Sequence, residues 1–256
     1  MQEEDSTRRR GDNEGEYTMN KKDNKIVIAM DNDIKDGLKL LETIGEDSEL
    51  KKKVYGVKIG SLWVLEKGVD IVKDVRNKIW GDCTIILDMQ KWPTDIPDIV
   101  KKQVCRVAET GVVDELIACP MGGGKKSLDA FVQSCKDSGM RPLCVLEMTH
   151  PESDSYLKTS SYKDILYDAG CIGIDGFIIP ATKDPKTEIK WHIETAFPKL
   201  LYDLYATGFK VQGGQAEPMR RFGVSRYIIG RAIYDDEDPI RAIYDAYAEI
   251  NGISVE

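Results

Sequence analysis

The sequence predicts an α/β protein in which strands and helices alternate along a single domain. The chain has 256 residues, a length that one large α/β domain accommodates. From Lys25 onward, short apolar runs rich in Val and Ile alternate with longer amphipathic segments, which is typical of parallel strands buried on both faces. Eight such runs in about 230 residues match the repeat number of a (β/α)8 TIM barrel. A doubly wound open sheet is the alternative that the same pattern allows.

The predicted strands are short apolar segments, and most are followed by a helical pattern. In chain order the strands are 25–30 (KIVIAM), 54–59 (VYGVKI), 83–88 (CTIILD), 112–118 (VVDELIA), 142–147 (PLCVLE), 173–179 (GIDGFII), 204–211 (LYATGFKV) and 226–230 (RYIIG). Apolar residues recur on one helical face in 33–44, 99–110, 125–139, 162–170, 192–203 and 238–250. The domain is therefore expected to span residues 25–256.

The first 24 residues are polar and charged, and they include EEDSTRRRGDNEGE. We expect residues 1–24 to form a disordered tail, because such a segment buries too little apolar surface to offset ordering. Met19 is a candidate alternative start. The chain has neither a secretory signal nor an apolar run long enough to span a membrane, so we expect a cytoplasmic protein. Its net charge of −8 argues against a general nucleic-acid or membrane-surface binder.

Cysteine and histidine usage argues against a metal centre. The six cysteines are scattered without CxxC spacing, and several lie inside apolar runs, where they behave as small buried hydrophobes. The two histidines, His150 and His192, make a histidine-rich zinc site improbable. We therefore expect reduced thiols and no metal.

Polar residues follow many of the predicted strands, at the end where a barrel carries its active site. The polar residues are Asp31, Lys58, Asp88, Lys91, Asp95, Thr149, His150, Thr182, Gln212 and Arg231, and Pro180 and Gly230 lie at the same strand ends. Two lysines and three acids on one rim are unusual for purely structural reasons. The sequence therefore predicts a charged site at the carboxyl ends of the strands.

Several of these residues also have structural interpretations. Asp31 suits the cap of the first helix, and Lys91 with Asp95 suits a solvated ion pair. Arg231 suits the surface of the last helix. Lys58 is harder to explain in this way, because a lysine inside an apolar strand must be paired or face a polar site.

The segments after the seventh and eighth strands favour a phosphate site. Barrels often bind phosphate with these two loops. The segment VQGGQ supplies backbone amides and the Gln212 side chain, although its glycines also suit a simple turn. The segment GRAIY supplies Arg231 at the start of a helix. We therefore expect a phosphorylated small-molecule ligand.

Six segments in series resemble the orotidine 5'-monophosphate (OMP) decarboxylase family. DMQKWPTDIPD resembles the Asp-x-Lys-x-x-Asp-Ile-Pro signature of the family, and IAMD and VKIG lie where it has its first aspartate and lysine. VLEMTHPES, FIIPATKDP and VQGGQAE with YIIGRAIYDDEDP are similar to its strand-5, strand-6 and phosphate segments. The resemblance covers roughly residues 25–250 in the correct order.

The resemblance implies decarboxylation of OMP to uridine 5'-monophosphate (UMP) in pyrimidine biosynthesis, without metal or organic cofactor. The implied catalytic residues are Lys58, Asp88, Lys91 and Asp95. The implied substrate-binding residues are Asp31, Thr149, Pro180, Gln212, Gly230 and Arg231. By analogy, Asp88 opposes the substrate carboxylate, Lys91 protonates C6, and Lys58 holds the charged network and contacts the ribose. The resemblance also implies a homodimer in which Asp95 serves the partner's site.

The remaining implied roles concern recognition of the substrate. Asp31 binds ribose hydroxyls, and Thr149, where the family usually has serine, contacts the pyrimidine. Gln212, Gly230 and Arg231 bind the phosphate.

The chain departs from the family pattern in its spacing. Asp88 and Lys91 are three residues apart instead of two, and Lys91 and Asp95 are four apart instead of three. A spacing of two puts side chains on one strand face, so Lys91 takes the catalytic position only if the chain bulges or leaves the strand. If the backbone stays extended, Gln90 takes that position. Thr207 also stands where the family usually has a proline.

Two other functions remain open at this point. The first is a magnesium-dependent sugar-phosphate aldolase or decarboxylase resembling hexulose-phosphate synthase. The second is a nucleotide-binding homologue without catalysis, which is expected if Gln90 rather than Lys91 faces the ligand.

Overall fold

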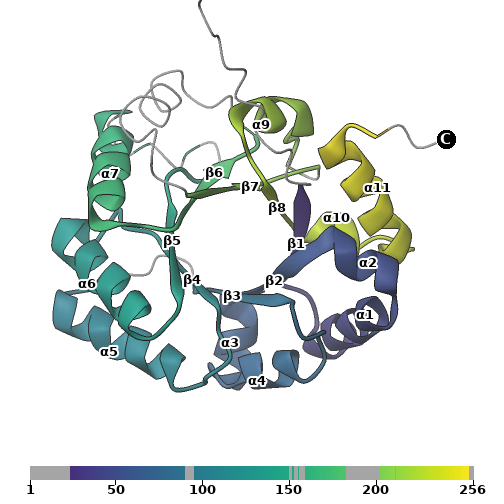
Figure 1. Cartoon of the computed structure of the whole chain (residues 1–256), viewed down its shortest axis with the longest axis horizontal. Coiled ribbons are helices and arrows are strands. Elements are labelled where there is room, and N and C mark those ends of the chain that lie inside the picture. The colour runs from purple at the N-terminus through teal and green to yellow at the C-terminus, as the bar shows by residue number, and fades with distance from the viewer. Residues whose placement is uncertain are drawn as a thin grey trace, which may run out of the picture.

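The protein is a closed barrel of eight parallel strands in the order β1 to β8, as predicted. The computed structural model describes residues 24–89, 95–149, 152, 155, 159–182, 202–210 and 212–253. The strands form a ring that helices surround (Figure 1). The expected disordered tail lies outside the described residues except for Asn24, whose side chain donates a hydrogen bond of 2.7 Å to the Ile250 carbonyl.

The eight strands have the following bounds: β1 Lys25–Met30, β2 Val54–Gly60, β3 Thr84–Asp88, β4 Glu115–Ala118, β5 Arg141–Val145, β6 Gly176–Pro180, β7 Asp203–Thr207 and β8 Arg226–Ile229. The described helices are α1 Ile34–Glu46, α2 Ser48–Lys53, α3 Ser61–Lys67, α4 Ile71–Arg76, α5 Pro97–Ala108, α6 Gly124–Asp137, α7 Thr159–Ile172, α9 Ala216–Phe222, α10 Arg231–Tyr234 and α11 Pro239–Asn251.

Every predicted strand is present, and the differences lie at the ends. β4 begins at Glu115 rather than at residue 112. β7 ends at Thr207 rather than at residue 211, because Gly208 and Lys210 have φ values of 82° and 61°, which a strand cannot contain. The predicted helix 192–203 lies outside the described residues up to 201, and its last residue, Asp203, belongs to β7.

Alternation along the strands decides which side chains reach the barrel interior. Val27 and Ala29 of β1 pack in the interior cluster, and Asp31 continues this series at the rim. In β3, Ile86 packs in the same cluster, so Asp88, two residues later, also faces inward. The intervening residues pack outward against the helices.

In strand β2, a β-bulge directs the lysine of the site into the barrel interior. Its pairing with β1 skips Tyr55, so β2 carries one extra residue there. Such a bulge shifts the alternation, and both Tyr55 and Lys58 consequently face the interior. Gly56 is required next to the bulge, because a Cβ at this position would lie 2.4 Å from the carbonyl oxygen of Thr84.

A hydrogen-bonded network closes the amino-terminal end of the barrel. Glu115 is fully buried, and its carboxylate accepts hydrogen bonds from the hydroxyls of Tyr55 at 2.6 Å and Tyr205 at 2.8 Å. Arg141 pairs with Glu115 and, at 2.8 Å, with Asp203. The buried carboxylate is thus paired and hydrogen-bonded, which burial of a charge requires. The open end of the barrel is therefore the opposite one, where the strands end.

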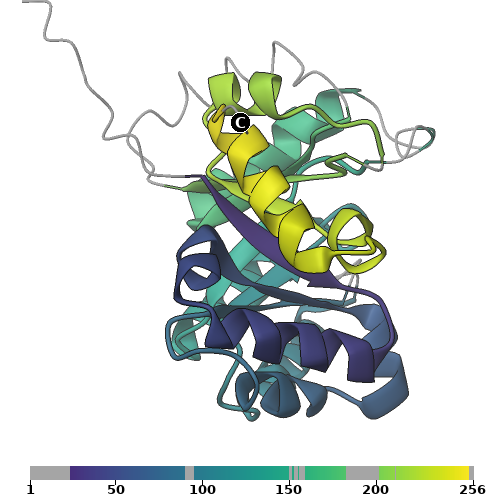
Figure 2. The same ribbon diagram turned by 90° about the vertical axis from the view of Figure 1, so that its right-hand side faces the viewer.

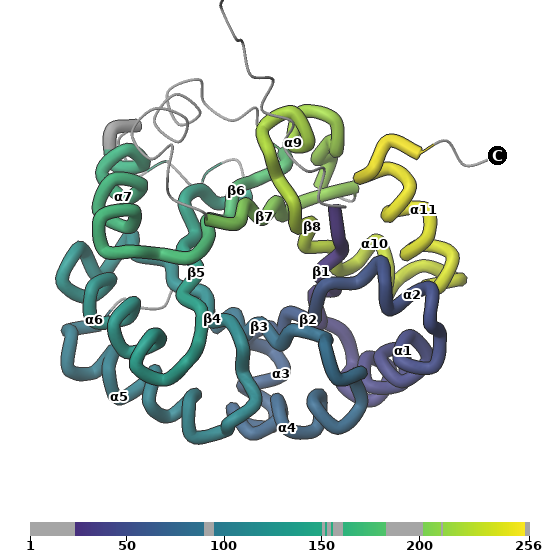
Figure 3. The backbone as a smooth tube through the Cα atoms, in the orientation of Figure 1, coloured from purple at the N-terminus to yellow at the C-terminus, as the bar shows by residue number. Residues whose placement is uncertain are grey.

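The described helices pack around the outside of the sheet. The C-terminal helix α11 lies across β1 and contacts α2 and α9 (Figure 2), and the trace returns to its start where β8 pairs with β1 (Figure 3). Among the described residues, no helix is long and apolar enough to cross a membrane.

Candidate functional site

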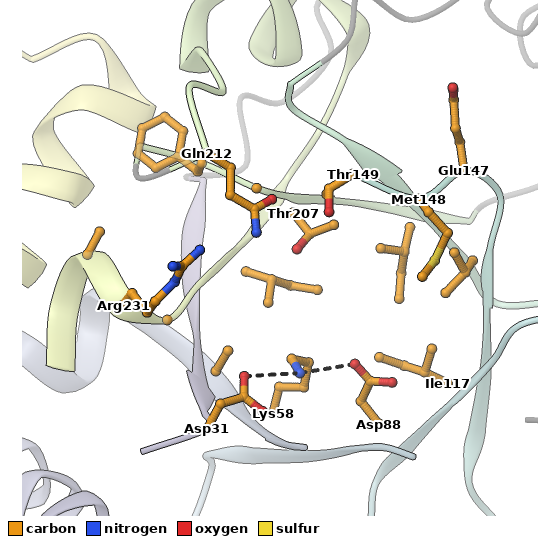
Figure 4. A pocket seen from close by; sticks show the side chains of 18 of the residues that line it. Asp31, Lys58, Asp88, Ile117, Glu147, Met148, Thr149, Thr207, Gln212 and Arg231 are labelled. Carbon is orange, nitrogen blue, oxygen red and sulfur yellow. Dashed lines mark hydrogen bonds and ion pairs between the residues drawn. The ribbon is translucent and has the colours of Figure 1, made fainter. Parts of the chain in front are cut away.

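A cavity opens at the carboxyl ends of the strands, where the sequence predicted the site. It combines acidic, basic, neutral polar and apolar side chains (Figure 4). Its lining residues are Ala29, Asp31, Lys58, Asp88, Ile117, Cys119, Val145, Glu147, Met148, Thr149, Ile178, Thr207, Gly208, Phe209, Gln212, Ile228, Gly230, Arg231, Ala232 and Tyr234.

Lys58 lies between two carboxylates on the floor of this cavity. Its Nζ is 3.0 Å from Oδ2 of Asp88 and 4.0 Å from Oδ2 of Asp31. Its side chain is 7% exposed, whereas that of Asp88 is 14% exposed and that of Asp31 is 35% exposed. The cation is therefore more deeply buried than either of its partners, and both carboxylates keep a surface toward the cavity.

The charge of Lys58 is held by these partners. Burial lowers the pKa of Lys58, but the carboxylates of Asp88 and Asp31 more than offset this effect, and the pKa lies above its ordinary value. Lys58 is therefore a cation at neutral pH. Because the pKa is raised in the folded state, the resulting stabilisation is present below the unfolded lysine pKa. It is lost only as the pH rises through the raised value, in the alkaline range.

Asp31 is positioned by a glycine on the neighbouring strand. A Cβ on Gly60 would lie 2.0 Å from Oδ1 of Asp31, so only glycine leaves room for this carboxylate. Asp31 is not the cap of the first helix, because the carboxylate of Asp33 accepts the hydrogen bonds of the N–H groups of Lys35 and Asp36. The structural interpretation of Asp31 is therefore wrong, and its carboxylate faces the cavity.

Gln212 and Arg231 lie on one side of the cavity (Figure 4), and Gly230, which precedes Arg231, also lines it. The side-chain amide of Gln212 lies against the backbone of Gly208. A Cβ on Gly208 would lie only 2.8 Å from Oε1 of Gln212. Gly208 also has a φ of 82°, which strongly favours glycine. This side offers an amide, a guanidinium and accessible backbone, which suit an anionic oxygen group.

The other predicted residues are distributed around the site. Thr149 lines the cavity, and its carbonyl accepts a hydrogen bond of 3.2 Å from the Thr182 hydroxyl. Pro180 is buried at the end of β6 and is not among the described residues that line the cavity. Asp95 is exposed before α5 and is likewise not a lining residue. Its carbonyl accepts a hydrogen bond of 2.5 Å from the hydroxyl of Ser127.

The choice between Lys91 and Gln90 falls outside the described residues, as does His150. Strand β3 ends at Asp88, and Met89 packs outward against the core. Alternation would direct Gln90 inward only if the strand continued to that residue, and β3 ends before it.

The apolar part of the site was not predicted from the sequence, because only polar residues at strand ends were expected there. Ile117, Val145, Ile178 and Ile228 face the cavity through the same alternation as the charged residues. Glu147 was missed as well. It is 2% exposed, and its side chain points away from the centre of the cavity (Figure 4). Following the period-two pattern along each strand would have identified the four apolar residues, and continuing it two residues past β5 would have identified Glu147.

The cavity is thus divided chemically. A charged floor of Asp31, Lys58 and Asp88 faces a neutral polar wall that contains Thr149 and Gln212, and aliphatic side chains lie between them (Figure 4). Such a site can bind a flat, partly apolar group and place a chosen atom of it beside fixed charges.

Comparison with protein families gives one consistent result. The model described as "Orotidine 5'-phosphate decarboxylase / HUMPS family" matches residues 24–246. The orotidine 5'-phosphate decarboxylase of Methanococcoides burtonii is 26% identical over 234 residues, which are 90% of this chain and 99% of the relative. The enzyme of the same name from Methanococcus maripaludis strain C6 is 30% identical over 223 residues, covering 84% and 92% of the two chains.

Solved structures give the same architecture. Orotidine 5'-monophosphate decarboxylase from Sulfolobus solfataricus superposes with a TM-score of 0.70 at 25% identity, covering 90% of this chain and 98% of the other. The enzyme from Methanocaldococcus jannaschii, complexed with the inhibitor BMP, superposes with a TM-score of 0.75 at 23% identity and covers 89% and 99% of the two chains. At this identity the second match supports the fold.

Proposed function

Because this chain belongs to the orotidine 5'-phosphate decarboxylase / HUMPS family, we propose that its cavity converts OMP to UMP and carbon dioxide in pyrimidine biosynthesis. The observation that carries the proposal is the buried Lys58 held between Asp88 and Asp31 at the open end of the barrel. The aliphatic and neutral polar walls supply the surface that a pyrimidine needs, and the side with Gln212 and Arg231 suits its phosphate.

The reaction breaks the bond between C6 of the pyrimidine and its carboxylate. Carbon dioxide leaves, and the electron pair of that bond remains on C6. In our proposal, Asp88 lies against the carboxylate and disfavours the bound substrate relative to the transition state. The Lys91 ammonium stabilises the developing negative charge and then protonates C6, which gives UMP. Fixed charges are effective here because they need no reorganisation during the reaction.

Binding at a distance from the reacting bond offsets the repulsion at Asp88. Arg231, Gln212 and the backbone at Gly230 bind the phosphate in this proposal, Asp31 and Lys58 bind the ribose, and Thr149 contacts the pyrimidine. Binding energy from such remote groups can be used to hold a substrate in an unfavourable contact. Pro180 contributes only through the shape of the chain at the end of β6.

The function is tested by mixing the purified protein with OMP in the presence of a chelator and following the ultraviolet absorbance change to UMP. We expect full turnover without added metal. Turnover that requires added magnesium would instead support the aldolase-type chemistry of the same superfamily. Binding of UMP without release of carbon dioxide would support a nucleotide-binding homologue.

We also propose that the enzyme is a homodimer in which Asp95 completes the partner's site. Asp95 is exposed and is not among the described residues that line its own cavity. Ile96, the next residue, is 63% exposed, and Leu62 and Leu65 of α3 are 58% and 80% exposed. A groove between α3 and α5 is lined by Val64, Val69, Met89, Ile99 and Val107 together with Lys102, Gln103 and Arg106. Exposed apolar surface of this kind marks contact sites, and a second copy would cover it.

Mixing two inactive variants is expected to restore activity if Asp95 is shared. A heterodimer of Lys91→Ala and Asp95→Asn subunits contains one intact site, so random exchange should return about a quarter of the wild-type activity. The control pairs Lys91→Ala with Asp88→Asn, which would lie in the same subunit's site, and should restore nothing. The measurement is OMP turnover after exchange, beside the molecular mass in solution. A monomer, or equal activity of the two mixtures, would contradict the shared site.

A cytoplasmic location is part of the proposal. All six cysteines are free, which is typical of a reducing compartment. Burial raises the pKa of the Cys83 thiol to about 12, so this thiol is protonated and unreactive at neutral pH.

A further inference from the structure

Thr207, the last residue of β7, brings a hydroxyl to the cavity. Along this strand Tyr205 packs in the barrel interior, whereas Leu204 and Ala206 pack outward. The alternation therefore directs Thr207 inward, one layer above Tyr205, and it lines the cavity. In the close-up view its hydroxyl points into the open space beside Thr149 (Figure 4).

The backbone at Thr207 is fixed while its hydroxyl is available. Its carbonyl accepts a hydrogen bond of 2.7 Å from the Ala181 N–H, and it is paired with Pro180 on β6 and Ile228 on β8. Among the residues that the structure describes, no hydrogen bond of its hydroxyl is found. A rigid strand thus presents a donor that a bound molecule can use.

The neighbours of Thr207 indicate which part of a ligand it meets. A Cβ on the next residue, Gly208, would lie 2.8 Å from Oε1 of Gln212 and 2.9 Å from Cγ2 of Thr149. Position 207 therefore adjoins the neutral polar wall, opposite the floor formed by Lys58 and Asp88 (Figure 4). Neutral hydroxyl and amide groups can donate hydrogen bonds to the carbonyl oxygens along one edge of a ligand. Charged groups of the ligand would instead pair with lysine and arginine side chains elsewhere in the cavity.

We propose that the Thr207 hydroxyl donates a hydrogen bond to a carbonyl oxygen of the pyrimidine and is a specificity-determining residue of this site. This inference rests on the proposed function and extends it to recognition of the base. Thr207 does not act on the reacting bond, because the charged groups lie on the opposite side of the cavity. Its contribution is therefore expected in binding of the base and not in the chemical step.

The test compares ligands with and without the base. Thr207→Val keeps the branched shape and removes the hydroxyl, Thr207→Ser keeps the hydroxyl, and Thr207→Ala is a second variant without it. Calorimetric titration is carried out with UMP and with ribose 5-phosphate. We expect Thr207→Val and Thr207→Ala to weaken UMP binding about five- to tenfold, as for loss of one hydrogen bond. Ribose 5-phosphate binding should be unchanged, and Thr207→Ser should resemble the wild type.

Kinetics provide an independent measurement. For OMP, KM should rise in Thr207→Val with little change in kcat, as expected when binding common to ground and transition states is lost. Equal weakening of UMP and ribose 5-phosphate, or no weakening of either, would overturn the role of Thr207 and leave the decarboxylase function standing. A wild-type protein that binds UMP but does not turn over OMP would overturn the function, while the UMP comparison would still decide the role of Thr207. A wild type that binds no UMP would overturn both.

Discussion

Replacement of Lys91 by alanine is expected to lower kcat for OMP by at least about a thousandfold. The reason is the fate of the electron pair on C6, which needs an adjacent cation while it forms and a proton afterwards. Lys58 cannot substitute, because it is held by Asp88 at 3.0 Å and is 7% exposed. UMP has no carboxylate and develops no such charge, so its Kd should change by only a few fold.

The matched control is Gln90→Ala, one residue earlier. If the chain bulges after Asp88, Lys91 faces the ligand and Gln90 does not. Gln90→Ala should then retain most of the wild-type kcat. The two variants are compared by single-turnover measurements of OMP consumption, with UMP titration to show that each still binds nucleotide. Loss of activity in Gln90→Ala and its retention in Lys91→Ala would show that the amide occupies the ligand side, and the chemistry proposed here would then be wrong.

This pair of variants also marks the limit of what the sequence could predict. Asp31 and Asp88 were predicted from their position at strand ends, and in the structure period-two alternation directs both to the inner face. The rule says nothing once a chain leaves the sheet, and β3 ends at Asp88. Periodicity alone therefore could not decide whether the three-residue step directs Lys91 or Gln90 toward the cavity.

The inward direction of the Lys58 side chain could not be predicted from the sequence for a different reason. An apolar strand with an internal lysine predicted a functional residue, but regular alternation does not place both Tyr55 and Lys58 in the barrel interior. The bulge at Tyr55 does so, and it depends on the close approach of Gly56 to β3. Such tertiary contacts cannot be read from spacing.

The apolar half of the site was predictable in principle. Ile117 and Ile178 follow the alternation that places the acids, yet an apolar residue in a strand is explained equally well by core packing. Only the closed barrel distinguishes the two, because it shows which interior layer is covered and which one opens to solvent. Gly60 was missed for a similar reason, since its role is the space that it leaves for Asp31 on the neighbouring strand.

The second large effect is expected from Asp88→Asn, which should reduce kcat by at least about a hundredfold. The same change should tighten OMP binding, because the carboxylate of Asp88 no longer opposes that of the substrate. Removal of about 1.4 kcal/mol of repulsion corresponds to a tenfold lower Kd. A fall in kcat together with tighter ground-state binding is the signature of lost ground-state destabilisation.

Asp31→Asn is the matched control, because both carboxylates flank the same lysine. Asp31 lies 4.0 Å from Lys58 and is 35% exposed, whereas Asp88 lies 3.0 Å from it and is 14% exposed. If Asp31 binds the ribose, its replacement should weaken OMP and UMP alike. Asp88→Asn should instead affect the two ligands differently, with a tighter Kd for OMP and little change for UMP.

The difference between these two ligands separates charge repulsion from simple positioning of Lys58. A side chain that only held Lys58 in place would, when replaced, loosen the ribose contact and weaken both ligands together. The dissociation constants are measured by rapid mixing before turnover, with each variant's unfolding transition as a check on its fold. Equal weakening of OMP and UMP in Asp88→Asn would reduce the role of Asp88 to holding Lys58. Tighter binding of OMP alone would mean that the enzyme uses phosphate and ribose contacts to hold two like charges together until the carbon–carbon bond breaks.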